Sequence, residues 1–137
     1  RPSGKFSTLL QPEMGFERGY CRPDCTTCGD VCPAGAIRPF TPEQKASTSV
    51  GYAVVVLDNC IAASEGVSCG TCARHCPSGA IRMVPRDANA SAADVAAVKI
   101  PTVDENRCLG CGACEYYCPS RPVSAIYIEG REEAVRF

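Results

Sequence analysis

The chain has 137 residues and a formal net charge of −1, with 12 cysteines, 7% aromatic residues and no Trp. This length allows one compact domain or two small lobes and excludes a large catalytic barrel. Because the chain has neither a bilayer-length apolar run nor a basic block, we expect no nucleic-acid partner and no direct membrane insertion. With so few aromatic side chains, disulfides or metals are expected to hold the fold together.

Three cysteine runs repeat along the chain, each ending in Cys-Pro and each followed within a few residues by Ala-Ile. In chain order the first run is Cys21, Cys25, Cys28 and Cys32, the second is Cys60, Cys69, Cys72 and Cys76, and the third is Cys108, Cys111, Cys114 and Cys118. The third run has the C-x2-C-x2-C-x3-C-P spacing typical of bacterial ferredoxins. The other two lengthen only the first gap.

The elements predicted around the first two runs are short. Residues 1–20 form an irregular lead segment. Thr41-Pro-Glu-Gln44 combines an N-cap, a proline at the first helical position and a capping-box partner, which predicts a short helix in an insert at 41–50. The β-branched segment 52–57 lies between turn residues and predicts a strand, and residues 70–75 suit one helical turn.

A second insert, 86–98, precedes the third run. Within it Ser91 to Asp94 either caps a short helix or belongs to a solvated linker. Residues 100–103 predict a strand and residues 112–117 another helical turn. The expected fold class is α+β, built from bacterial ferredoxin-like repeats of strand, cluster loop, helix turn and strand. We expect a single domain over 1–137, with a lead segment at 1–20, a two-cluster half at 21–84, a linker at 85–98 and a third motif at 99–137.

The cysteine spacing predicts three 4Fe-4S clusters. A cubane cluster needs four thiolates, and a tight Cys-x-x-Cys-x-x-Cys loop supplies three, while the cysteine before proline completes the other cluster in two-cluster ferredoxins. Exchange between the first two runs then gives two ligand sets, Cys21, Cys25, Cys28 and Cys76 for cluster 1, and Cys60, Cys69, Cys72 and Cys32 for cluster 2.

The third cluster is expected on Cys108, Cys111 and Cys114, with its fourth ligand open. By the same rule Cys118 points away from this site, towards a partner cluster that the chain lacks. The site is then three-iron, water-ligated, closed by a rearranged Cys118, or empty, and we expect it to be the weakest of the three. The rival hypothesis is a closed array of three complete clusters.

Other chemistries fit the sequence less well. Pairwise disulfides give no reason for three repeats of a triplet plus Cys-Pro, and zinc favours two separated Cys-x-x-Cys pairs. His75, the one histidine, is expected at the surface. The first run has the spacing of radical S-adenosylmethionine enzymes, but Thr27 stands where those enzymes usually have an aromatic residue. A redox-sensing or structural cluster protein is the other alternative.

Fully ligated clusters have no open iron for a substrate, so we expect an electron carrier rather than an enzyme. Four arginines lie near the runs in sequence, and they either raise cluster potentials or serve as solvated surface charges. These residues are Arg38, Arg82, Arg107 and Arg121.

The segment from Gly51 to Cys76, with eight residues after Cys60, and the segment from Pro101 to Glu115 resemble the NapG/MauM-type polyferredoxins. These are accessory electron carriers of periplasmic nitrate reductase and methylamine dehydrogenase systems. The resemblance implies a redox-protein donor and acceptor, including a membrane quinol-oxidising subunit, and a periplasmic or membrane-associated location. It also implies four motifs, the first paired with the fourth and the second with the third, so we expect a motif upstream of residue 1.

Overall fold

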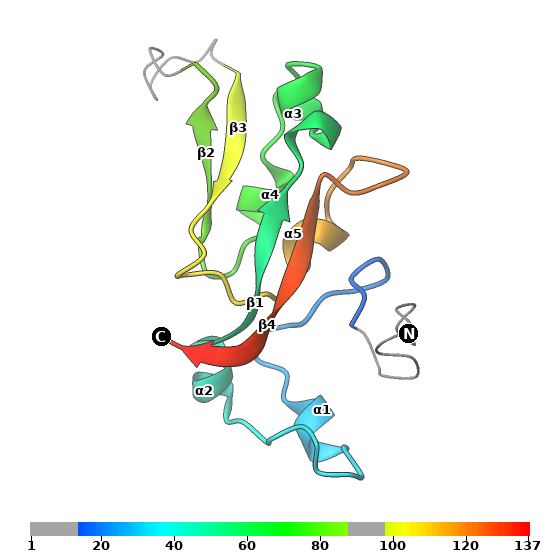
Figure 1. Cartoon of the computed structure of the whole chain (residues 1–137), viewed down its shortest axis with the longest axis vertical. Helices are drawn as coiled ribbons and strands as arrows, with labels where there is room; N and C mark the ends of the chain where they lie inside the picture. The colour runs from blue at the N-terminus through cyan, green and yellow to red at the C-terminus, as the bar shows by residue number, and fades with distance from the viewer. Residues whose placement is uncertain (1–13, 88–97) are drawn as a thin grey trace.

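The computed structural model describes residues 14–87 and 98–137, so the predicted helix at Ser91 to Asp94 lies outside the described residues. Figure 1 shows short helices and antiparallel strands, which confirms the predicted α+β fold. The helices are α1 (Thr27–Asp30), α2 (Pro42–Ala46), the 3-10 helix η2 (Leu57–Asn59), α3 (Ile61–Ser64), α4 (Thr71–Arg74) and α5 (Ala113–Tyr116), and the strands are β1 (Thr48–Val55), β2 (Ile81–Pro85), β3 (Lys99–Val103) and β4 (Ile126–Arg136).

The strands interlock the second and third runs. β1, which precedes the second run, pairs antiparallel with β4, which comes after the third, and β2 pairs antiparallel with β3. The second run therefore lies between β1 and β2, and the third between β3 and β4, so each of these two runs is flanked by one strand from each sheet (Figure 1). Residues 48–85 and 99–136 form one interlocked unit. This differs from the expected division into a half at 21–84 and a separate motif at 99–137, because strand pairing joins elements that are distant in sequence.

Several local predictions are confirmed. Thr41 accepts a hydrogen bond from the Gln44 N–H at 3.3 Å and its own N–H donates to the Gln44 side chain at 3.1 Å, so the capping box begins α2. Helices α4 and α5 are the two predicted turns, and β3 matches the predicted 100–103. The strand predicted at 52–57 begins earlier and ends at Val55, since η2 comes next, and no helix was predicted where α1 forms.

The core of the interlocked unit consists mostly of small side chains. Its buried members are Ala53, Cys60, Ala62, Ala80, Ile81, Cys108, Cys114, Cys118, Ala125 and Ile126. None is aromatic, and cysteines supply four of the ten. The centre of the fold is therefore built around the second and third runs. Within the described ranges, none of the helices has the length and apolar character needed to cross a bilayer.

Candidate iron–sulfur sites

One pocket gathers four thiols from two runs. Cys60, Cys69 and Cys72 line it together with Cys118, and apolar residues such as Val55 complete the wall. The pocket leaves about 330 Å³ free of protein atoms, part of it open to solvent. Four thiols from two runs match the four thiolates that one cubane cluster takes. Among the described residues, no group of three potential ligands is arranged to hold a single metal ion.

A second set of four thiols consists of the first three cysteines of the third run with Cys76 of the second. Burial and then the neighbouring thiolates raise the pKa of Cys114, the neighbours being Cys111, Cys108 and Cys76. Burial likewise raises the pKa of Cys111, with Cys76 and Cys108 adding to it. Four thiols this close resist ionising together unless cationic iron compensates their charge. The donor set therefore fits a cluster.

This grouping corrects the pairing predicted from sequence. Cys32 does not line the pocket of Cys60, where Cys118 stands instead. Cys76 belongs with the third run rather than with Cys21, because β2 leads directly from the second run to its pairing with β3. The prediction that Cys118 points away from its own triplet agrees with the structure, but the partner site that it needs lies within the chain.

Burial and hydrogen bonds shift the pKa values of the thiols in the first pocket in opposite directions. Burial raises the pKa of Cys72 to about 11. Burial also acts on Cys69 and Cys118, but hydrogen bonds outweigh it and lower the pKa of both thiols. The donors to Cys69 are the N–H groups of Thr71 and Gly70 and the Thr71 hydroxyl, with 3.6 Å between Cys69 Sγ and Thr71 Oγ1. Donors of this kind stabilise the thiolate form that binds iron.

The loop of the third run is held by close backbone contact with β1. The Val50 N–H donates to the Leu109 carbonyl at 3.1 Å. Gly110 has φ 71°, and a Cβ there would lie 2.5 Å from the backbone nitrogen of Gly51. Only glycine fits both this conformation and this approach. The contact fixes the backbone immediately before Cys111, and sequence spacing alone gave no sign of it.

The first run repeats the local geometry of the second. Cys25 Sγ lies 3.4 Å from Thr27 Oγ1, as Cys69 does from Thr71 at 3.6 Å. Gly35 and Gly79 come after the two Cys-Pro pairs with φ 62° and 61°. Backbone N–H groups of residues 34–37, that of Ile37 most strongly, lower the pKa of Cys32. The first run is thus folded as a cluster loop, and the described residues 14–47 around it contain no strand.

Exposure separates the first run from the other two. Cys25 and Cys28 are exposed, whereas the Cys60, Cys108, Cys114 and Cys118 thiols are buried. All twelve cysteines are free of disulfides. The Lys45 ammonium of α2 donates to the Cys25 carbonyl and ties the loop to α2. The structure therefore brings eight of the predicted ligands into two sets of four and leaves the thiols of the first run outside both sets.

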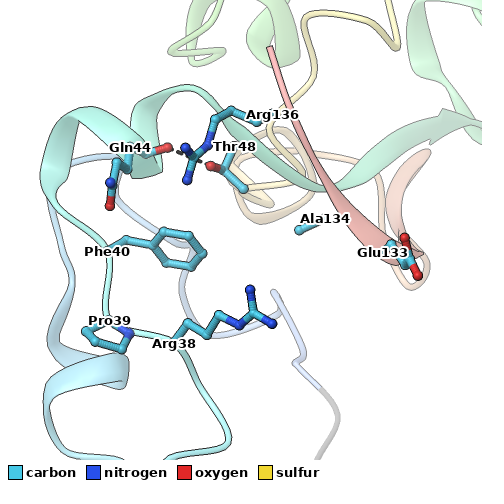
Figure 2. Close-up of a pocket in the computed structure, with 8 residues that line it drawn as sticks. All are labelled: Arg38, Pro39, Phe40, Gln44, Thr48, Glu133, Ala134 and Arg136. Carbon is cyan, nitrogen blue, oxygen red and sulfur yellow. Dashed lines mark hydrogen bonds between the residues drawn. The ribbon is translucent and has the colours of Figure 1, made fainter.

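The remaining singled-out residues lie outside the thiol sets. His75 is exposed, as predicted, and stacks on Tyr117 with 3.9 Å between ring centroids. Arg121 donates to the Cys118 carbonyl at 2.6 Å, and Arg107 donates to the Ser78 carbonyl at 3.1 Å. Arg38 lines a separate hollow beside α2 and β4, which Figure 2 shows. None of the eight residues that line this hollow is a cysteine.

Comparison with known families agrees with these sites. Residues 20–80 and residues 65–121 each match the 4Fe-4S dicluster domain. The chain belongs to this family. Together the two matches span residues 20–121, well over half of the chain. No curated protein matches the chain. This 4Fe-4S dicluster protein is a ferredoxin-like iron–sulfur protein with an electron-transfer role.

The two matches of the dicluster domain overlap at residues 65–80, which hold three cysteines of the second run. By sequence the second run can thus serve as half of a pair with either neighbour. The strand pairing and the shared pocket of Cys60 and Cys118 select the third run as its partner. The structure therefore resolves a choice that the dicluster pattern leaves open.

Proposed function

We propose that this chain carries single electrons through three 4Fe-4S clusters between two redox proteins. The observation that supports it most is the exchange of fourth thiols between the second and third runs. Cys118 would complete the ligand set of Cys60, Cys69 and Cys72, while Cys76 would complete that of the third run. A cluster of this kind accepts and releases one electron at a time.

The residues of the chain contribute position and electrostatics to this role. Strand pairing holds each thiol set on backbone from both runs, and the Gly110 contact fixes the loop of the third run. Hydrogen bonds to Cys69 and Cys118 stabilise charge on their sulfurs. Four of the proposed ligands are buried in the core, namely Cys60, Cys108, Cys114 and Cys118. Donors to sulfur and burial are the levers by which a protein sets a cluster potential.

The first run supplies the third cluster of this proposal. Its loop has the local geometry of the second run, and its own four cysteines are the described thiols left after the two sets are formed. Because no second run pairs with it and Cys25 and Cys28 are exposed, this site would be the least protected of the three. The weakness predicted for the site of Cys108 therefore belongs to the first run instead.

The partners are inferred from the resemblance to the NapG/MauM-type polyferredoxins. In this proposal the chain is an accessory subunit of a respiratory or periplasmic oxidoreductase system, taking electrons from a membrane quinol-oxidising subunit and passing them to a soluble redox protein. The chain itself would bind no organic substrate. Its location would be periplasmic or membrane-associated.

Anaerobic reconstitution tests this function. We expect about twelve irons per chain, four in each of three clusters, and reversible one-electron reduction monitored by potentiometric spin-resonance titration. Uptake of only about eight irons would support the two clusters shared by the second and third runs and would contradict the third cluster. A protein that takes up no iron–sulfur cluster, or one that cannot be reduced reversibly, would contradict the function as a whole.

A redox-sensing role is the second candidate, and exposure of the first run favours it. Cys25 and Cys28 are open to solvent, as a sensing cluster requires. In this case brief exposure to air would destroy the first-run cluster and change the fold around residues 21–40. An electron carrier would instead keep its fold while it cycles between oxidised and reduced forms.

A further inference from the structure

A buried aromatic ring ahead of the first run packs on the third run. Phe16 is 6% exposed, yet it lies outside the core of the interlocked unit. Its ring lies on Gly112, the N-cap residue of α5, where a Cβ would overlap the ring. Gly112 also has φ 78° and directly follows Cys111. The ring thus covers the backbone between two thiols of one set.

A hydrogen bond joins the first run to the same place. The Cys21 N–H donates to the Cys111 carbonyl at 2.8 Å. Both residues are proposed iron ligands, and they belong to different sets. The sulfur of Cys21 is therefore connected to the sulfur of Cys111, in the interlocked unit, through covalent bonds of the two cysteines and one hydrogen bond.

Aromatic contacts extend this attachment. The Tyr20 ring lies 5.6 Å from the Tyr116 ring and 5.5 Å from the Tyr117 ring, measured between centroids. Tyr117 in turn stacks on His75, which directly precedes Cys76. Figure 1 shows the segment that begins at residue 14 passing below α5 on its way to α1. Three kinds of contact thus hold residues 16–21 to the third run.

We propose that residues 16–21 form a strap that holds the first run against the thiol set of Cys76 and the third run, and that the first run is the outward end of the electron path. The inference rests on the proposed three-cluster function. With clusters bound at both sites, exchange of one electron across the strap would oxidise one cluster and reduce the other, with no bond or proton moved. An external one-electron carrier then meets the exposed thiols of Cys25 and Cys28.

The strap is tested with Phe16→Ala in the iron-loaded protein, with Phe16→Leu as the conservative variant. Met14→Ala is the matched control, because Met14 lies in the same segment and is 62% exposed. Hydrogen exchange at the Cys21 amide reports the strap directly. We expect about tenfold faster exchange in Phe16→Ala, the effect of opening one ordinary hydrogen bond, with partial rescue in Phe16→Leu and no change in the control.

Spin-resonance spectra of the reduced protein supply the second readout. We expect Phe16→Ala to lose the magnetic coupling between the first-run cluster and the paired clusters, while the coupling within the pair stays. About twelve irons with unchanged coupling and unchanged Cys21 exchange would overturn the strap and leave the three-cluster function intact. About eight irons in the unmutated protein would overturn both the strap path and the third cluster, leaving the paired clusters.

Discussion

Two regions of the molecule carry the same short loop, in which a four-residue helix starts two residues after the second cysteine. In the interlocked unit these helices are α4 and α5, and in the first run the helix is α1. The regions differ in the segment after each Cys-Pro pair. Ile81 and Ile126 enter β2 and β4 and are 5% and 2% exposed, whereas Ile37, at the matching place after the first run, is 44% exposed.

This difference separates two levels of structure. The cluster loop forms from local sequence, since in each run the cysteines, the turn residues and the proline after the last cysteine lie within 17 positions. Completion of a thiol set is a long-range property, because Cys118 reaches the pocket of Cys60 only when β1 pairs with β4. A run without a strand partner keeps its loop and receives no thiol from another run.

The largest effect is expected from removal of iron. The core of the interlocked unit consists mostly of Ala and Cys, and a core of this size supplies at most about 3–5 kcal/mol without a staple. Chelation under reducing conditions is therefore expected to unfold the unit, because metal binding contributes to its folding. Circular dichroism and protease resistance measure this, and a native spectrum in iron-free protein would contradict it.

The next effect is expected from replacing the fourth thiols. Cys118→Ser removes a thiol from the pocket of Cys60, so we expect that site to lose about one to four irons while the third-run site stays intact. Cys32→Ser is the matched change in the first run and is expected to spare both paired sites. Iron analysis with Mössbauer spectra measures both variants. Damage to the Cys60 site by Cys32→Ser would instead support the pairing predicted from sequence.

A smaller effect separates the two regions at glycines of similar backbone conformation. Gly110→Ala places a Cβ against the Gly51 backbone at φ 71°, and we expect a loss of about 2–5 kcal/mol. At Gly35 φ is 62° and an added Cβ would meet no atom within 4 Å. Gly35→Ala is therefore expected to cost only the backbone strain of about 1–2 kcal/mol. Anaerobic denaturation monitored by visible absorbance compares the two, and equal midpoints would argue against the close contact of β1 with the third run.

The smallest effect concerns the register of the β1–β4 pair. Tyr52 stands opposite Glu129, whose negative charge is the main cause that raises the pKa of the Tyr52 phenol. The charge opposes formation of phenolate, so Glu129→Gln is expected to let Tyr52 ionise at lower pH. NMR of ring-labelled tyrosine monitors the titration, with Glu132→Gln as the control. If the Tyr52 pKa does not change in Glu129→Gln, the register of β1 against β4 differs from the one described.

The sequence was sufficient for the local features of this fold. The capping box of Thr41 and Gln44 and the helix turns α4 and α5 depend on residues within a few positions of each other. The twelve cysteines could be grouped into runs for the same reason. The ferredoxin-like α+β class could be predicted from the alternation of strand, loop and turn.

The pairing of the runs could not be predicted in the same way. Ala-Ile comes after all three runs, so this pattern does not show which segment finds a strand partner. One usable signal was that no strand is predicted ahead of the first run. The second and third runs are each preceded by a strand that pairs, β1 and β3, and the first run has no such strand in the described residues. The contact of Phe16 with Gly112 joins residues 96 positions apart and has no periodic signature.

The most direct test of the account is an anaerobic crystal structure of the iron-loaded protein, in which the iron–sulfur bonds assign each cysteine to a cluster. We predict that Cys118 binds the cluster of Cys60, Cys69 and Cys72, and that Cys76 binds the cluster of the third run. Iron bonded to both Cys32 and Cys60 in one cluster would contradict the exchange between the second and third runs on which the proposed function depends.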